Sequence, residues 1–132
     1  MFKRKIYSKM QEWKKDSDGK TALLIEGARR IGKSTVVEEF AKNEYDSYIL
    51  IDFAKKDKEV ELYFEKFLND MNTLFMMLQA HFGVQLQKRK SVIIFDEVQM
   101  FPQARAAIKY LVADGRYDYI ETGSLISIKE NV

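Results

Sequence analysis

A glycine-rich run between residues 27 and 34 has the residue types and the spacing of a phosphate-binding loop. It fits the pattern G-x-x-x-x-G-K-[ST] through Gly27, Ala28, Arg29, Arg30, Ile31, Gly32, Lys33 and Ser34. The glycines let the backbone bend and approach a phosphate closely, and the N–H groups of the loop and of the following helix attract the anion. We expect the Lys33 ammonium to bind the β- and γ-phosphates and the Ser34 hydroxyl to ligate Mg²⁺.

The segments on either side of this run have the order that the motif requires. Residues 21–25 form a short apolar run that is typical of a buried strand, and residues 34–42 place apolar side chains on one helical face. An ordinary corner between a strand and a helix, with a surface lysine, would explain the same residues without a ligand. The order of strand, glycine loop and helix favours the phosphate-binding interpretation.

A second run, residues 91–97, ends in two adjacent carboxylates. Its apolar residues suit a central parallel strand that is covered on both faces, and open α/β sheets bind ligands at the C-terminal ends of their strands. We therefore expect Asp96 to hold Mg²⁺, directly or through water, and Glu97 to polarise the attacking water as a general base. The alternative is a strand followed by a solvated acidic turn, and the lysine motif upstream favours the catalytic interpretation.

Three further features leave two interpretations open. Thr122 and Ser124 end a short strand and are candidates for sensing the γ-phosphate, but Thr-Gly-Ser is also ordinary turn chemistry that caps a helix. Gln99 helps to place water or hydrogen-bonds the loop, or it is a plain polar residue at a strand end. Arg29 and Arg30 touch phosphates or a neighbouring subunit, or they are solvent-facing spacers, which we favour.

Hydrophobic spacing and turn residues divide the chain into alternating helices and strands. Helices are predicted over residues 2–15, 33–43, 60–68, 74–82 and 102–113, and strands over residues 22–25, 48–53, 91–97 and 117–122. This alternation implies an α/β fold with a parallel, doubly wound sheet and right-handed connections. The first helix packs on the sheet edge in the interpretation that we favour, and covers the base of a nucleotide in the other. Asn69 and Asp70 break or bend the chain between the third and fourth helices.

Several other side chains are assigned ordinary structural roles. Met71, Met76 and Met77 are expected to be flexible core fillers, with a partner surface as the alternative. His81 is expected to sit passively at the end of a helix. A solvated loop explains the basic turn at residues 88–90, and a DNA contact is the minor alternative.

Composition limits the class of protein. The sequence of 132 residues amounts to one domain, residues 1–132, and its net charge of +2 gives nucleic-acid binding no support. It contains no cysteine and one histidine, which excludes disulfides and any metal site built on cysteines or on several histidines. The N-terminus lacks the apolar core of a secretory signal, and no apolar stretch reaches the ~20 residues of a membrane helix. We therefore expect a cytoplasmic protein with no membrane partner.

Together the motifs resemble the N-terminal ATPase domain of a group of bacterial and archaeal AAA-family proteins that carry a C-terminal domain of unknown function, DUF4143. The resemblance is carried by residues 27–35, residues 93–99, Pro102 with Ala106, Ile108 and Lys109, and Thr122, Gly123 and Ser124. It implies a three-layer P-loop NTPase with a mostly parallel sheet of about four strands in the order 1-4-3-2. It also implies ATP and Mg²⁺ as cofactors, and it adds Thr35 to the nucleotide-binding positions.

The chain departs from the resemblance at its end. It stops at Val132, where domains of this group continue into a helix, a fifth strand and a lid. We therefore expect an N-terminal fragment, truncated relative to a full AAA domain, whose partners are the missing C-terminal region and further copies in a homo-oligomer. Arg105 and Arg116 are the only arginines after the acidic strand, and neither is placed as an arginine finger. The first strand is expected to be an exposed edge.

Three functions follow from these motifs. A module that binds Mg-ATP and hydrolyses it slowly is favoured, because a partner's arginine finger can be worth about 10³–10⁵ in rate. A nucleotide-dependent switch or scaffold without useful hydrolysis is the second. A small-molecule kinase is the third, and the adjacent pair of Asp96 and Glu97, with no visible lid, argues against it. The preference for ATP over GTP is inferred from the resemblance, since no guanine-reading motif is suitably placed in the sequence.

Overall fold

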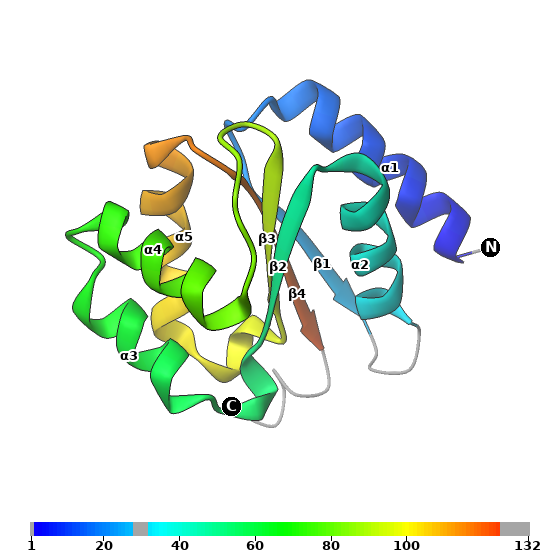
Figure 1. Ribbon diagram of the computed structural model, residues 1–132. Coiled ribbons are helices and arrows are strands. Elements are labelled where there is room, and N and C mark those ends of the chain that lie inside the picture. The colour runs from blue at the N-terminus through cyan, green and yellow to red at the C-terminus, as the bar shows by residue number, and fades with distance from the viewer. Residues whose placement is uncertain (1, 28–31, 125–132) are drawn as a thin grey trace.

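A four-stranded parallel sheet forms the centre of the molecule (Figure 1). The structure, a computed structural model, describes residues 2–27 and 32–124. The sheet has the order β1-β4-β3-β2, made of β1 (Leu23–Gly27), β4 (Asp118–Ser124), β3 (Ser91–Asp96) and β2 (Ser47–Asp52). Helices cover both faces, so the predicted three-layer α/β fold and its strand order are confirmed.

Strand β3 is central because its residues are apolar on both faces. All six are buried, and their side chains alternate between two cores. Val92 and Ile94 belong to the core beneath α1 (Phe2–Ser17) and α2 (Lys33–Glu44). Ile93 and Phe95 belong to the opposite core.

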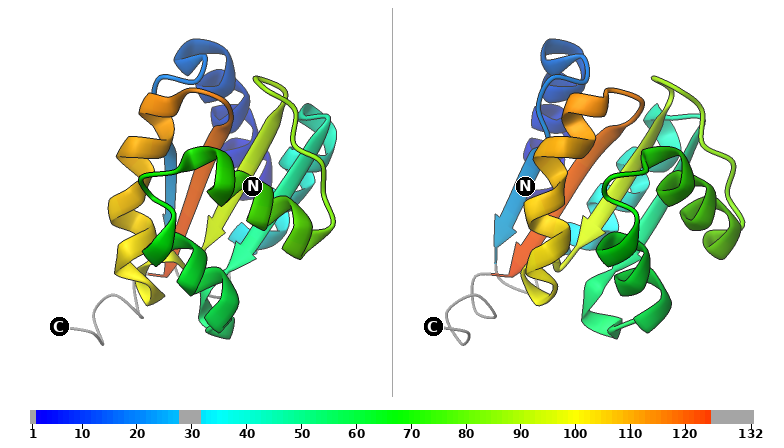
Figure 2. Two further views of the ribbon diagram at one scale, coloured as in Figure 1. Left: turned by 60° about the vertical axis from the view of Figure 1, so that its left-hand side comes forward. Right: turned by 90° about the vertical axis from the view of Figure 1, so that its left-hand side faces the viewer.

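The first helix packs against α2 and against the core that contains Ile25 of the edge strand β1. Met10 of α1 is fully buried in the core that α2 and the sheet share. The rings of Tyr7 and Phe40 meet edge to face at 5.4 Å, and the Tyr7 hydroxyl donates to Glu44 at 3.1 Å. The two helices therefore form one layer beside β1 (Figures 1 and 2).

The other face is covered by α3 (Lys58–Lys66), α4 (Met71–Phe82) and α5 (Pro102–Asp114), as Figure 2 shows. Two short 3₁₀ helices, η2 (Phe53–Lys55) and η3 (Val98–Met100), follow the ends of β2 and β3. A cluster of aromatic rings joins these turns to the sheet, and it consists of Phe53, Phe64, Phe95 and Phe101. The cluster packs against the C-terminal ends of β2 and β3.

Local hydrogen bonds place two element boundaries. The Asp70 carboxylate accepts from the Thr73 backbone N–H at 3.2 Å and from its hydroxyl at 2.6 Å, so Asp70 starts α4 and the chain breaks there. The Asp52 carboxylate accepts from the Ala54 N–H at 3.0 Å and turns the chain into η2. Strand β2 therefore ends at Asp52, one residue earlier than predicted.

Two predicted structural roles were wrong. Met76 is 59% exposed on α4 and does not fill the core. His81 is not passive, because its Nε2 lies 2.9 Å from the Asp57 carboxylate and its Nδ1 lies 3.3 Å from that of Glu59. Burial raises the pKa of Asp57, but the hydrogen bonds from His81 and from two backbone amides outweigh it and lower the pKa overall. His81 thus ties the end of α4 to the start of α3.

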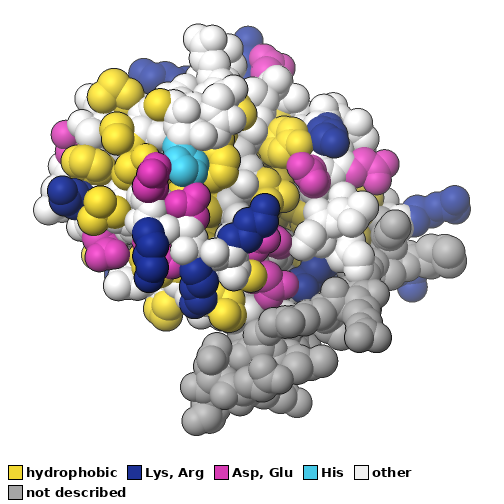
Figure 3. Space-filling model, turned by 60° about the horizontal axis from the view of Figure 1, so that its bottom comes forward, with side chains coloured by type: hydrophobic (Ala, Val, Ile, Leu, Met, Phe, Trp, Pro, Cys, Tyr) yellow, Lys and Arg dark blue, Asp and Glu magenta, His cyan; other side chains and the backbone are white. Residues whose placement is uncertain are grey.

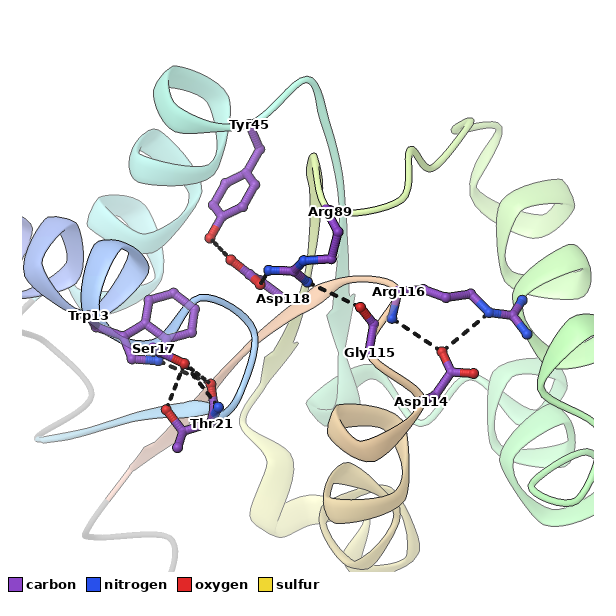
Figure 4. A network of polar contacts seen from close by, with 9 residues as sticks. All are labelled: Trp13, Ser17, Thr21, Tyr45, Arg89, Asp114, Gly115, Arg116 and Asp118. Carbon is purple, nitrogen blue, oxygen red and sulfur yellow. Dashed lines mark hydrogen bonds and ion pairs between the residues drawn. The ribbon is translucent and has the colours of Figure 1, made fainter.

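The basic turn before β3 also has a structural role that the sequence did not reveal (Figure 4). The buried Asp118 carboxylate accepts from Arg89 Nη2 at 2.7 Å and from the Tyr45 hydroxyl at 2.5 Å. Burial and this bond raise the pKa of Tyr45 far above its ordinary value. Gly19 is close as well, since a Cβ atom there would lie 2.6 Å from the guanidinium carbon. The network joins three chain segments at the N-terminal edge of the sheet.

We expect Asp118→Ala to destabilise the fold, because Arg89 and Tyr45 would lose the acceptor that they share. The expected loss in the free energy of unfolding is about 2 kcal/mol, measured by urea denaturation. Asp46→Ala, at an exposed position, is the control and should stay within about 0.5 kcal/mol of the unchanged protein. Equal losses in the two variants would show that the network contributes nothing specific.

Candidate nucleotide-binding site

Three segments that are distant in sequence meet at the C-terminal edge of the sheet. The first turn of α2 brings Lys33 and Ser34, the end of β3 brings Asp96 and Glu97, and the end of β4 brings Thr122. They meet because the strands are parallel and therefore end at one edge, where sheets of this kind bind ligands. Figure 3 shows the molecule from this side, with acidic and basic side chains interspersed over the described surface.

Helix α2 begins with an end that suits an anion. Gly32 precedes it with φ of 75° and ψ of 24°, a left-handed conformation that glycine adopts without strain. Glycine has no side chain that could accept a hydrogen bond here, so Gly32 leaves the first N–H groups of α2 without a side-chain cap. A helix N-terminus of this kind attracts phosphate through its N–H groups and its dipole.

The Lys33 ammonium is buried and paired with a carboxylate. Its side chain is 2% exposed, and Nζ lies 3.2 Å from Oε2 of Glu97, which is 14% exposed. Burying a charge is costly unless an opposite charge accompanies it. Glu97 therefore provides the negative charge beside Lys33 in this structure, at the place where the motif would bring a phosphate.

The Ser34 hydroxyl and the Asp96 carboxylate form the part of the site that suits Mg²⁺. Ser34 Oγ donates to Asp96 Oδ1 at 2.7 Å, and a hydroxyl that donates its proton keeps lone pairs for a metal. Within residues 2–27 and 32–124, no group of three or more His, Cys, Asp and Glu side chains could hold a metal. Such sparse oxygen ligation fits Mg²⁺, which is usually held by one or two carboxylates together with phosphates and water.

Glu97 stands on a turn that is rare for its residue type. Its φ of 53° and ψ of 50° are left-handed, and such strain in a residue other than glycine is concentrated at functional sites. Its backbone N–H donates to Thr122 Oγ1 at 3.0 Å, and its Oε1 accepts from Gln99 Nε2 at 2.7 Å. Gln99 is thus a contact of the carboxylate itself, a role that sequence reasoning did not single out.

The two hydroxyls at the end of β4 are not equivalent. Both residues lie within the strand rather than in a turn. Thr122 Oγ1 donates to Asp96 Oδ1 at 2.6 Å. Ser124 Oγ is buried and has no hydrogen-bond partner within the described part of the chain. Ser124 pairs in register with Gly27, where the glycine loop begins.

The remaining candidates are less informative. Ala28, Arg29, Arg30 and Ile31 lie outside the described residues. Thr35 is exposed on the first turn of α2 and takes part in none of the bonds above. Arg105 lies 3.9 Å from the Glu121 carboxylate, and Arg116 lies 3.3 Å from that of Asp114. Burial raises the pKa of Glu121, and Arg105 opposes the shift.

Comparison with known proteins identifies the class. The fold described above is that of a P-loop NTPase, and a family model described as an AAA domain matches residues 19–131. The chain therefore belongs to this AAA domain family, and its core is of the nucleotide-binding ATPase type.

One solved structure supports the fold. The chain is similar to C. elegans PCH-2, with a TM-score of 0.53 and 13% sequence identity. The alignment covers 92% of this chain but 36% of that one, so the chain spans about a third of its length. No curated protein sequence matches. Within the described residues, no helix is long and apolar enough to cross a membrane.

We expect Glu97→Gln to tighten ADP binding, because Lys33 would no longer be paired with a charge that competes with the phosphates. A charge-assisted hydrogen bond of about 1.5–3 kcal/mol corresponds to a change in affinity of roughly 10- to 150-fold. ADP is the ligand of choice, since slowed hydrolysis cannot affect its measured affinity. Calorimetric titration would measure the change, with Glu65→Gln on the exposed face of α3 as the matched control. Unchanged or weaker binding would contradict the competition.

Proposed function

We propose that this chain binds Mg-ATP at the C-terminal edge of its sheet and hydrolyses it slowly. The proposal is carried by one observation: contacts of 3.2 Å or less link Lys33 to Glu97 and Ser34 to Asp96. The two residues of each contact are 64 and 62 positions apart in the sequence, respectively. They are the side-chain types that phosphoryl transfer from ATP to water requires.

Binding divides into two parts. The N-terminus of α2 and Lys33 take the β- and γ-phosphates. Ser34 and Asp96 hold the metal ion. When bound, Mg²⁺ supplies charge neutralisation at the phosphate oxygens. The buried hydroxyl of Ser124, which has no hydrogen-bond partner among the described residues, is available to donate to the γ-phosphate.

In the proposed hydrolysis, Glu97 is the general base. A water oxygen attacks the γ-phosphorus, the bond to the bridging oxygen breaks, and ADP leaves. The water proton passes to the Glu97 carboxylate, which Gln99 orients through its 2.7 Å hydrogen bond. Lys33 must first exchange Glu97 for the phosphates, and this exchange frees the base as it fixes the substrate.

Slow turnover follows from the charges at the site. Phosphoryl transfer is accelerated when an arginine stabilises the charge on the transferred group. Arg105 and Arg116 contact Glu121 and Asp114 instead, away from Lys33. A cation from another subunit or domain would therefore raise the rate. Association with DUF4143 and with further copies stays a prediction from the resemblance.

A switch without useful hydrolysis is the second candidate, and the pair of Lys33 and Glu97 favours it. Nucleotide binding alone would separate this pair and displace the turn that carries Glu97. On this view the bound state itself is the signal. ATP and a non-hydrolysable analogue would then have equal effects on the protein.

The test measures nucleotide affinity and ATP turnover per chain over a range of protein concentrations. Lys33→Ala should weaken binding at least tenfold, since it removes the cation beside the phosphates. Lys42→Ala, exposed on the same helix, is the matched control. Glu97→Gln should abolish turnover while binding persists.

The outcomes separate the candidates. Unchanged affinity in Lys33→Ala would show that the site is misassigned. Binding without turnover above that of Glu97→Gln would favour the switch. A per-chain rate that rises with concentration would show that a neighbouring copy completes the site, and phosphate transfer that requires an added acceptor would favour a kinase.

A further inference from the structure

We propose that Thr122 is a positioning residue that fixes Asp96 and Glu97 relative to each other, and that it does not bind phosphate. This inference rests on the proposed function, since it assigns a role within the same site. It separates the two hydroxyls at the end of β4, which the sequence could not distinguish. Ser124 is then the hydroxyl of this strand that contacts the nucleotide.

The hydrogen bonds of Thr122 carry the argument. Its side chain is fully buried, its Oγ1 donates to Asp96 Oδ1 at 2.6 Å, and the same oxygen accepts from the Glu97 N–H at 3.0 Å. A hydroxyl has one proton, and phosphate oxygens can only accept. A phosphate contact would therefore require Thr122 to abandon a short, charge-assisted bond to a carboxylate.

Asp96 is held by two hydroxyls at one oxygen. Ser34 Oγ and Thr122 Oγ1 both donate to Asp96 Oδ1, at 2.7 Å and 2.6 Å. Ser34 precedes Asp96 in the sequence, and Thr122 follows it. The two bonds fix the rotation of the carboxylate before any ligand arrives. Partners that orient a metal ligand in this way are the usual outer contacts of metal sites.

Glu97 is held by the same hydroxyl through its backbone. The bond to Thr122 satisfies an N–H group in the left-handed turn, where the chain leaves β3 and no strand partner follows. The turn leads into η3, whose Gln99 contacts the Glu97 carboxylate. Thr122 thus fixes the backbone from which the general base projects.

The register of the sheet explains why position 122 has this role. Phe95 pairs with Glu121, so Thr122 comes one step beyond the last position at which β4 pairs with β3, level with Asp96. Since side chains alternate along a strand, Thr122 points to the same face as Ile120, toward the α2 side of the sheet. Ser124 follows two residues later on this face, nearer to the glycine loop.

The test compares Thr122→Val with Thr122→Ser, using a non-hydrolysable ATP analogue, which carries the γ-phosphate, as the probe. Affinity is measured by calorimetry with Mg²⁺ and with EDTA, and ATP turnover is measured in parallel. In Thr122→Val, the factor by which Mg²⁺ raises the affinity should be roughly 10- to 100-fold smaller than in the unchanged protein, and turnover should fall by a similar factor. Its affinity in EDTA should match that of the unchanged protein. Thr122→Ser keeps the hydroxyl and should restore both properties.

The control is Thr73→Val, which also removes a hydroxyl hydrogen bond, of 2.6 Å to Asp70, but on α4 away from the site. Thermal unfolding reports whether Thr122→Val is folded. If it is not, Thr122→Ser decides the case alone, because loss of the Mg²⁺ effect in that variant overturns the inference.

Two other results would overturn it. Equal weakening of the analogue's binding by Thr122→Val in Mg²⁺ and in EDTA would mean that Thr122 contacts phosphate directly. An unchanged Mg²⁺ effect in a folded Thr122→Val would mean that the hydroxyl positions nothing. Failure of the unchanged protein to bind nucleotide at all would overturn the proposed function, and the inference with it, and that failure is recognised without any variant.

Discussion

A buried positive charge at the start of α2 is the constraint on which the site depends. The Lys33 ammonium lies at the helix end whose dipole is also positive, and burial removes the water that would otherwise solvate it. An anion beside the ammonium therefore stabilises the domain. In this structure the anion is Glu97, and in the proposed complex it is a phosphate. In the proposed mechanism, one exchange of partners at Lys33 therefore couples binding to catalysis.

The two edges of the sheet meet this kind of constraint in different ways. At the N-terminal edge, Asp118 accepts hydrogen bonds from Arg89 and Tyr45, and Arg89 also donates to the Gly115 carbonyl, so the partners all belong to the fold (Figure 4). At the C-terminal edge, Lys33 and Glu97 neutralise each other, and in the proposed mechanism each exchanges the other for a ligand. A closed network at one edge supports exchangeable pairs at the other, because both are built on the same strands β3 and β4.

Much of the fold followed from the sequence because its determinants are local. The apolar run of β3, the glycine before α2 and the aspartate that starts α4 each specify their own segment. The strand order came from the resemblance. The contacts of Arg89, of His81 and of Gln99 could not be predicted, since each depends on a neighbour that only the register and the helix packing supply.

The candidate site shows the same division. The motifs specify that Lys33, Ser34, Asp96 and Glu97 are present, and parallel strands bring them to one edge. The motifs do not specify which partner each side chain contacts before a ligand binds. They also do not specify that the Thr122 hydroxyl donates its hydrogen bond to Asp96. Hydroxyl roles depend on distances of a few tenths of an ångström, and these arise only when β3 and β4 are in register.

The pairing of Lys33 with Glu97 also explains why a complete set of side chains need not give fast chemistry. The attraction that keeps the buried ammonium stable without a ligand draws the carboxylate away from the position of a general base. Once phosphates replace the carboxylate, their negative charge repels Glu97 at the distance where it must accept a proton. A further cation near the γ-phosphate would reduce that repulsion and leave Lys33 on the phosphates. Arg105 of α5 and Arg116 of the turn after it are paired with Glu121 and Asp114, so the proposed mechanism assigns that role to neither of them.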